Sequence, residues 1–158
     1  MSDLFDDESL AVLERQIDEW LGNLRSTNSA IVAIDHAEPE PAFRSRWYVR
    51  MAGESKEFTT IWITLGQRTL RYETYVMPAP EENAEHLYES VLRRNERLVG
   101  AHFSIGAEDA LFLRGELPLA LVCEAELDRI VGTIYDIVEK AFPSLIRIGF
   151  ASRFADDD

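Results

Sequence analysis

The sequence has little of several residues that commonly define a binding or catalytic chemistry. Its 158 residues include one cysteine, three histidines and eight scattered glycines. The lone Cys123 cannot form an internal disulfide, and no apolar run approaches the roughly 20 residues that a membrane-spanning helix needs. The start of the sequence also lacks the apolar stretch of an export signal. We therefore expect a cytoplasmic protein that does not bind a membrane.

Basic residues are scarce as well. Sixteen lysines and arginines stand against 29 aspartates and glutamates, which gives a net charge of −13. Such a charge repels the phosphate backbone that dominates nucleic-acid affinity, so nucleic acid is not an expected partner. Part of the excess lies in two acidic ends, about residues 1–7 and 155–158. We expect these ends to be disordered parts of a single domain over 1–158, with docking tails for a basic partner as the alternative.

Motifs for catalysis or cofactor binding are absent too. The three histidines, His36, His86 and His102, have no partner at a metal-ligand spacing. No glycine-rich phosphate cradle and no Gly-x-Ser-x-Gly elbow occur, so the sequence predicts no catalytic residue, metal or cofactor. Cys123 stands just before a predicted helix, where we expect a buried or capping thiol. A redox or nucleophilic role is the alternative.

Hydrophobic periodicity predicts the elements. Apolar residues at steps of three and four predict three helices, over residues 8–25, 81–98 and 124–141. Asp7 is expected to cap the first helix, Gly100 to close the second and Pro143 to stop the third. Period-two alternation and β-branched residues predict six strands, over residues 31–34, 46–51, 60–65, 70–76, 101–105 and 110–117. After Pro143, residues 145–154 are expected to pack back on the body.

The order of these elements predicts the fold class. The order is α-β-β-β-β-α-β-β-α, and short turns join the three central strands into an antiparallel meander. The chain lacks the strand-helix-strand alternation that a parallel sheet needs. We therefore predict an α+β fold in which helices pack on one face of an antiparallel sheet.

The strands of the meander sort their side chains onto two faces. The face predicted to lie in the core carries Trp47, Val49, Met51, Ile61, Ile63, Leu65, Leu70, Tyr72 and Val76. Tyr48, Trp62 and Tyr75 stand on the opposite face among polar residues, and Glu73 is expected there at a solvated surface. Exposed aromatics bury a large area with few rotamers to fix, so this face is the strongest candidate interface. The alternative is that a loop or a terminal segment covers it.

Arg93 and Arg94 form the most concentrated positive spot in the chain. Glu85 and Glu89 precede them at helical spacings, which predicts ion pairs within one helix. The alternative is that the two arginines anchor an acidic segment of a partner.

Several short sequence segments resemble those of the YbjN family of bacterial proteins, over about residues 47–151. They lie at residues 87–95, 100–105, 111–119, 126–132 and 149–151. The resemblance implies a fold like that of type III secretion chaperones, which often form homodimers. Proteins of this family are described as sensory-transduction regulators, and the resemblance supplies no catalytic residues. This chain departs from it in an additional acidic first helix and in Cys123, where a threonine is common.

Together these features predict a non-enzymatic module that binds a partner protein or peptide, through exposed apolar patches or a sheet edge, and that forms a homodimer. A regulator of signalling or stress responses that acts through an unknown effector is the second hypothesis. An enzyme whose site is assembled from distant residues is the third. The candidate partner-binding residues are Tyr48, Trp62, Tyr75, Arg93 and Arg94.

Overall fold

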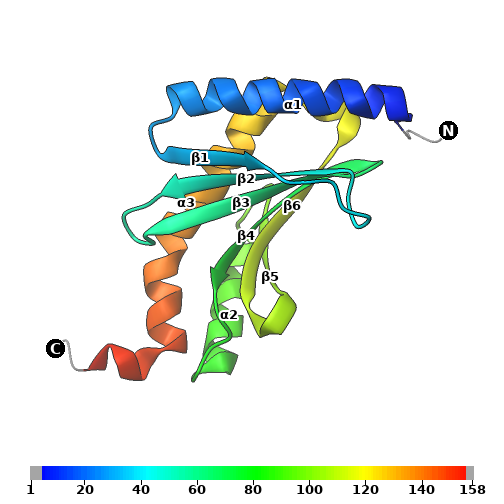
Figure 1. Cartoon of the computed structure of the whole chain (residues 1–158). Coiled ribbons are helices and arrows are strands. Elements are labelled where there is room, and N and C mark those ends of the chain that lie inside the picture. Colours follow the sequence, from blue (N-terminus) through cyan, green and yellow to red (C-terminus); the bar gives the residue numbers. More distant parts are fainter. Residues whose placement is uncertain (1–4, 156–158) are drawn as a thin grey trace.

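Six antiparallel strands and three α-helices form the framework of residues 5–155, the part of the chain that the computed structural model describes (Figure 1). The helices are α1 (Asp7–Thr27), α2 (Ala84–Asn95) and α3 (Glu124–Gly149). The strands are β1 (Ile31–His36), β2 (Ser45–Ala52), β3 (Phe58–Leu65), β4 (Thr69–Met77), β5 (His102–Ile105) and β6 (Leu111–Pro118). They form one sheet in the order β1-β2-β3-β4-β6-β5. The predicted order of helices and strands is confirmed.

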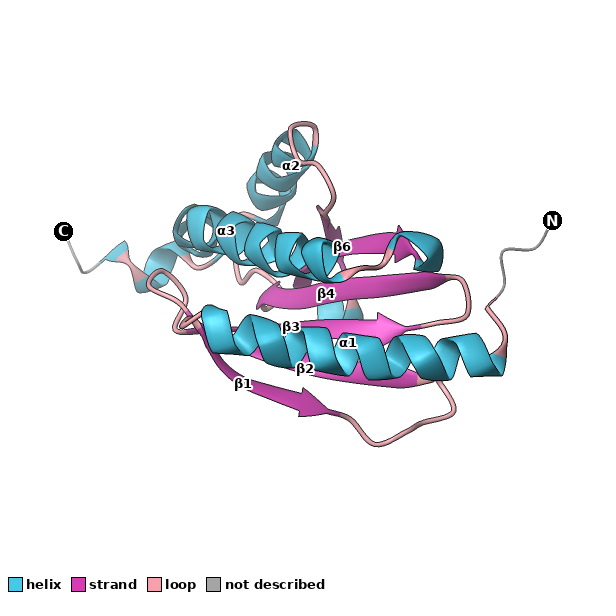
Figure 2. Ribbon diagram, turned by 90° about the horizontal axis from the view of Figure 1, so that it is seen from above, coloured by secondary structure: helices cyan, strands magenta, loops and turns pink. Residues whose placement is uncertain are grey.

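Two long helices cover one face of this sheet. Seen from above, α1 and α3 both lie over the sheet and run roughly along its strands (Figure 2). The helix α2 packs against α3 and β5. The predicted α+β class, with helices on one face of an antiparallel sheet, is confirmed. Within residues 5–155, no helix combines the length and the apolar character that crossing a bilayer requires.

The core lies between the sheet and these helices. All nine residues that period-two alternation assigned to the core face are no more than 2% exposed. The helix α1 adds a stripe of buried residues at steps of three and four, namely Leu10, Leu13, Ile17, Leu21 and Leu24. Burial of each such side chain contributes roughly 1.5–3 kcal/mol to folding. The apolar residues that alternate along the strands and those at helical spacing in α1 therefore pack in one hydrophobic cluster.

The start of α1 differs by one residue from the prediction. Asp6, not Asp7, is the N-cap, and its side chain accepts a hydrogen bond of 2.7 Å from the backbone N–H of Ser9. This hydrogen bond lowers the pKa of the Asp6 carboxyl. Asp6 and Asp7, expected in a disordered end, are thus ordered because the helix needs an acceptor there. Of the remaining residues of the expected ends, 1–4 and 156–158 lie outside the described residues.

The second helix is shorter than predicted, because its last residue bonds to a strand. The side chain of Asn95 donates to the carbonyl of Phe103 (3.1 Å) and accepts from the N–H of Phe103 (2.8 Å). Gly100 has a φ of +85°, in the left-handed region, but lies five residues beyond the helix. The expected closure by Gly100 is therefore wrong.

The third helix passes through Pro143 and ends at Gly149, so the expected stop is wrong. Proline removes one backbone donor, and in a helix interior it costs about 3 kcal/mol. Pro143 itself is exposed, whereas Ala141 and Leu145 on either side of it are 2% and 0% exposed. Burial of the apolar face beyond the proline offsets this cost, and the start of the segment expected to pack back on the body is helical.

Cys123 occupies the N-cap position of α3, as its place in the sequence predicted. Its side chain is exposed and forms no capping hydrogen bond. The expectation of a buried or capping thiol is therefore wrong. The physical reason is that a thiol is a weak hydrogen-bond acceptor, unlike the oxygens of Ser, Thr, Asp or Asn.

Candidate partner-binding surface

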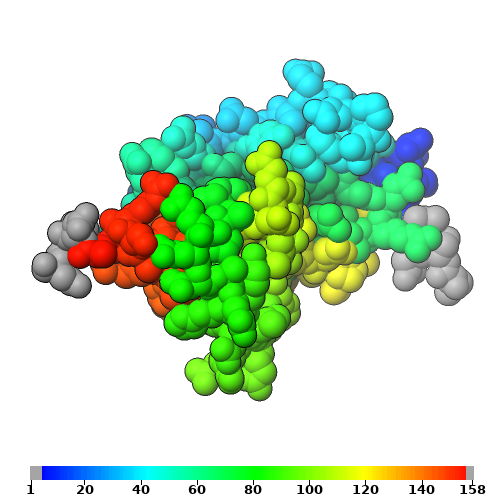
Figure 3. Space-filling model, turned by 90° about the horizontal axis from the view of Figure 1, so that it is seen from below, coloured from blue at the N-terminus to red at the C-terminus, as the bar shows by residue number. Residues whose placement is uncertain are grey.

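The face of the sheet opposite α1 and α3 is not covered by these two helices, and we call it the outer sheet face. Figure 3 views the molecule from the side away from α1, most of which is hidden there. The side chains of this face alternate with the core residues along the strands and include Arg46, Tyr48, Arg50, Phe58, Trp62, Arg71, Glu73, Tyr75, Phe112 and Arg114.

Two pairs of aromatic rings form the centre of the outer sheet face. Tyr48 and Trp62 are cross-strand partners on β2 and β3, and their rings meet edge to face at 5.9 Å. Tyr75 and Phe112, on β4 and β6, meet in the same way at 5.8 Å. Tyr75 is 40% exposed and Phe58 is 36% exposed. The predicted placement of the three aromatics on one face is confirmed, and the edge-to-face contacts favour these ring orientations.

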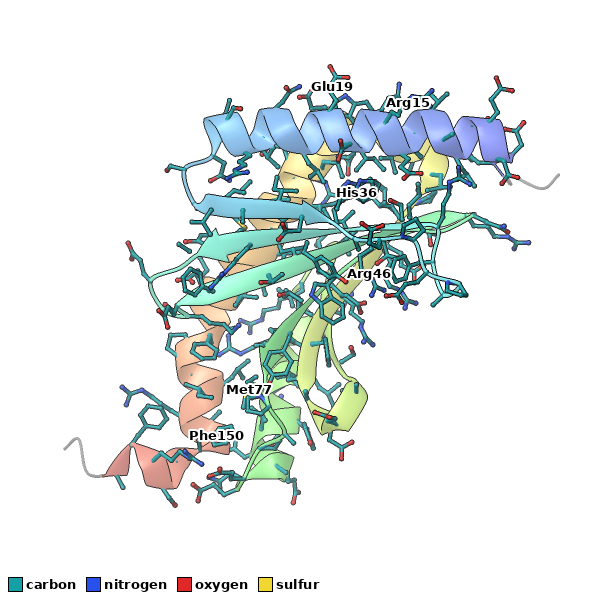
Figure 4. All side chains as sticks on the ribbon, in the orientation of Figure 1. Arg15, Glu19, His36, Arg46, Met77 and Phe150 are labelled. Atoms are coloured by element: carbon teal, nitrogen blue, oxygen red, sulfur yellow. The ribbon has the colours of Figure 1, made fainter. Side chains whose placement is uncertain are left out.

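Cationic side chains lie over two aromatic rings of this face. The Arg46 guanidinium lies 5.3 Å from the Trp62 ring centre, and that of Arg50 lies 3.9 Å from the Phe58 ring centre. Figure 4 shows Arg46 on the side of the strands away from α1. Among the described residues, Arg46 and Arg50 form no salt bridge. The outer sheet face therefore combines flat apolar area with hydrogen-bond donors, in a chain that is acidic as a whole.

Glu73 departs from its expected environment. It lies on the outer sheet face, but it is only 6% exposed and accepts a hydrogen bond of 2.5 Å from Arg114 Nε. The expectation of a solvated carboxylate is wrong because β6, which is distant in sequence, brings Phe112 and Arg114 beside it. Cross-strand pairing, also expected, is confirmed. A carboxylate buried to this degree requires such a partner.

The turn between β2 and β3 is fixed from the other side of the sheet. The Glu139 carboxylate of α3 accepts hydrogen bonds from the backbone N–H groups of residues 54–56, at 3.1, 2.7 and 3.4 Å. Lys56 then donates to the carbonyls of Phe58 (2.9 Å) and Tyr75 (3.4 Å). Burial lowers the pKa of Lys56, and the charge of Glu139 opposes that shift. A helix of the covered face thus positions one end of the outer sheet face.

Both edges of the sheet are less suited to binding than this face. Asn95 occupies backbone groups of the edge strand β5. The other edge strand, β1, has an irregularity between Ile31 and Ala33, and Arg25 donates to the Val32 carbonyl (3.3 Å). Bulges and side chains that occupy edge groups are common devices against strand addition. The sequence left two binding modes open, an exposed apolar patch or a sheet edge. The structure favours the exposed face over the edges.

Arg93 and Arg94 lie on a different surface from the three aromatics. They line a groove of about 610 Å³ between α2 and α3. Arg93 forms the predicted ion pair with Glu89, at 2.9 Å. The candidate residues predicted from sequence therefore divide into two separate groups.

Sequence reasoning missed a polar cluster beneath α1. His36 lies below α1 (Figure 4). Its Nε2 lies 2.5 Å from Ser45 Oγ, and its Nδ1 lies 3.6 Å from an oxygen of Asp18. This is the order of a serine, a histidine and an acid, but Ser45 is 2% exposed and its hydroxyl donates to Glu14 at 3.3 Å. Trp47 also donates to Asp18, at 3.1 Å. Because a substrate could not reach this hydroxyl, we assign the cluster to the attachment of α1 to the sheet.

No local signal in the sequence could have revealed this cluster, since its members come from α1, β1 and β2. Within residues 5–155, no group of three or more histidines, cysteines and carboxylates could hold a metal ion.

Comparisons with known proteins agree with this architecture. The model of the YbjN family, described as "Putative bacterial sensory transduction regulator", matches residues 33–147. The chain belongs to the YbjN family. The match begins after α1 and ends within α3.

Relatives of this YbjN chain occur among mycobacterial proteins. Uncharacterized protein Rv0487 of Mycobacterium tuberculosis is 33% identical over 104 residues, which are 66% of this chain and 57% of that protein. Uncharacterized protein ML2442 of Mycobacterium leprae is 32% identical over 107 residues, or 68% of this chain and 58% of that protein. The aligned stretch therefore spans little more than half the length of these relatives.

A solved structure has a similar fold. It is a chain of the heterodimeric ExoU-SpcU complex from the type III secretion system of Pseudomonas aeruginosa. The TM-score is 0.54 at 12% identity, over 80% of this chain and 95% of that chain. At this identity the likeness concerns the fold alone, and the expected secretion-chaperone-like fold is confirmed.

Proposed function

We propose that this YbjN-family chain is a non-enzymatic binding module whose outer sheet face holds a segment of a partner protein. Two pairs of rings, with one guanidinium group over Trp62 and another over Phe58 of the same face, carry the proposal. We further propose that it acts as a single module in the cytoplasm, which a chain with one cysteine would suit.

The chemistry of this face suits a protein segment better than a small molecule. Aromatic rings that are already locked in edge-to-face pairs lose little freedom when a partner covers them. Guanidinium groups held over rings offer N–H donors to backbone carbonyls or carboxylates of that partner. A face of this kind is extended and not a closed pocket, whereas small-molecule sites are usually concave.

The fold likeness supports the same proposal, since the similar chain was solved in a heterodimeric complex. The description of the YbjN family favours a second role, in which partner binding regulates signalling or a stress response through an unknown effector. Both roles use the same kind of surface, and they differ in what the bound partner does next.

We also propose that the chain forms a homodimer. Leu92 and Val99, on and just beyond α2, are 67% and 82% exposed, and exposed apolar residues of this kind are common at interfaces. Sedimentation of the wild type should give the mass of a dimer, and Leu92→Glu should shift it to a monomer. A wild type that sediments as a monomer at all concentrations would contradict the proposal.

The partner-binding proposal is tested by capture and then by affinity. Tagged wild type, Tyr75→Ala and Val12→Ala are used to isolate bound proteins, which are identified by mass spectrometry. Val12 on α1 is the matched control, because it is 41% exposed and Tyr75 is 40% exposed. We expect one or a few proteins to be held by the wild type and Val12→Ala and reduced with Tyr75→Ala.

Calorimetry with the purified partner should then show weaker binding to Tyr75→Ala only. Equal capture by the two variants, or nothing above a tag-only sample, would overturn the proposal. Turnover of a small molecule that both variants retain would favour an enzyme instead.

A further inference from the structure

The groove between α2 and α3 has a floor that could hold an apolar side chain. Its volume is about 610 Å³, within the range of ordinary ligand sites. Phe103 of β5, Leu98 after α2 and Ile137 of α3 contribute apolar side chains to it. None of the residues of the outer sheet face lines this groove, so it is a separate surface.

Positive charge surrounds that floor. Arg93, Arg94, Arg97 and Lys140 line the groove, and Asp136 is the one acidic residue among the lining residues. Asp136 is already paired with Lys140 at 2.8 Å. Four of the chain's 16 basic residues thus lie around one groove in a molecule whose net charge is −13. Local charge of this kind attracts a carboxylate against the sign of the whole protein.

The arginines of the groove are incompletely satisfied. Arg93 pairs with Glu89, but Arg94 and Arg97 form no salt bridge within the described part of the chain. The guanidinium groups of Arg94 and Arg97 are therefore not neutralised by a carboxylate of the described residues, and they can pair with an acidic ligand.

We propose that this groove binds an acidic protein segment in which one apolar side chain is flanked by carboxylates. The apolar side chain lies on the floor beside Phe103 and Ile137, while the carboxylates accept hydrogen bonds from Arg94 and Arg97. A nucleic acid fits less well, because the net charge repels a long polyanion and the apolar floor would be left without a partner. This inference goes beyond the proposed function, since it assigns a second site with its own ligand chemistry.

A synthetic probe tests the groove directly. The probe is a fluorescein-labelled peptide in which one phenylalanine is flanked on each side by three aspartates. Fluorescence anisotropy should show binding to the wild type, with at least about a tenfold loss for the double variant Arg94→Gln/Arg97→Gln. Binding should also weaken as salt rises from about 50 to 500 mM.

Matched controls separate local recognition from general charge. The double variant Arg15→Gln/Arg68→Gln removes the same charge from exposed positions outside the groove, and its affinity should stay within about twofold of the wild type. Trp62→Ala should also bind the probe like the wild type, which keeps this test independent of the outer sheet face. Chemical shifts of the 15N-labelled protein should move around Phe103 and Ile137.

Four results would overturn the proposal. They are no binding by the wild type at millimolar peptide, equal binding of a peptide with asparagine in place of aspartate, tighter binding of a single-stranded oligothymidine, and equal losses in the two double variants. Far-UV circular dichroism identifies a variant that has failed to fold. In that case Ile137→Ala, which shortens one side chain of the floor, should measurably lower the affinity for the peptide.

Discussion

Replacement of Trp62 by alanine should weaken partner binding while leaving the fold intact. Trp62 is half-buried on the outer sheet face, with its ring against Tyr48 at 5.9 Å and near Arg46 at 5.3 Å. Trp47 is the matched comparison, because it lies on the neighbouring strand but faces the core, is 0% exposed and donates to Asp18. The two tryptophans therefore differ in the face of the sheet that they occupy.

The expected magnitudes follow from these contacts. Trp62→Ala loses an edge-to-face pair, worth about 0.5–1.5 kcal/mol, and a cation–π contact, worth about 0.5–1 kcal/mol. Its free energy of unfolding should fall by about 1–3 kcal/mol. Trp47→Ala loses a fully buried ring and should fall by about 3–5 kcal/mol or more. A domain with a typical stability of about 5–15 kcal/mol survives the first change comfortably.

Urea unfolding followed by far-UV circular dichroism measures both variants without relying on tryptophan fluorescence. Affinity for the captured partner should fall by about 2 kcal/mol, or roughly 30-fold, for Trp62→Ala, as is usual for an aromatic at the centre of an interface. If Trp62→Ala unfolds, or proves as destabilising as Trp47→Ala, the assignment of the two faces is refuted. If it folds and binds like the wild type, the face is not the binding surface.

Three further changes test how the fold supports this face. Glu139→Ala removes the acceptor for three backbone N–H groups and should lower the free energy of unfolding by about 1–3 kcal/mol, with faster amide exchange in the β2–β3 turn. Unchanged exchange would show that Glu139 does not fix this turn. Burial raises the pKa of Tyr72 above its ordinary value of 10.0, so stability should fall as pH rises through the folded pKa, and Tyr72→Phe should flatten that decline in urea titrations at alkaline pH. An identical decline in Tyr72→Phe would refute this origin. Asn95→Ala should cost about 1–2 kcal/mol and speed amide exchange in β5, whereas normal protection would show that the edge does not depend on Asn95.

Strand faces could be predicted from sequence because alternation acts between neighbouring residues. Tyr48, Trp62 and Tyr75 each lie one step along a strand from a core residue, namely Trp47, Ile63 and Val76, and the pleat converts each step into a change of face. The sequence pattern did not assign Phe58 and Phe112 to the outer sheet face. The predicted strand began after Phe58, and the continuous apolar run around Phe112 hides its alternation.

Features that depend on contacts between distant elements could not be predicted. The continuation of α3 past Pro143 depends on the burial of Leu145, which the local sequence does not report. The burial of Glu73 depends on Arg114, 41 residues away. The basic groove likewise needs Arg94 of α2 and Lys140 of α3 to meet across a helix interface.

The most direct test of a partner bound to the outer sheet face is hydroxyl-radical footprinting of the protein alone and with the captured partner. Oxidation of Tyr48, Trp62 and Tyr75 should fall severalfold in the complex, while that of Trp20 on α1 should stay the same. Unchanged oxidation of the three aromatics, or protection confined to α1, would contradict the assignment of this face.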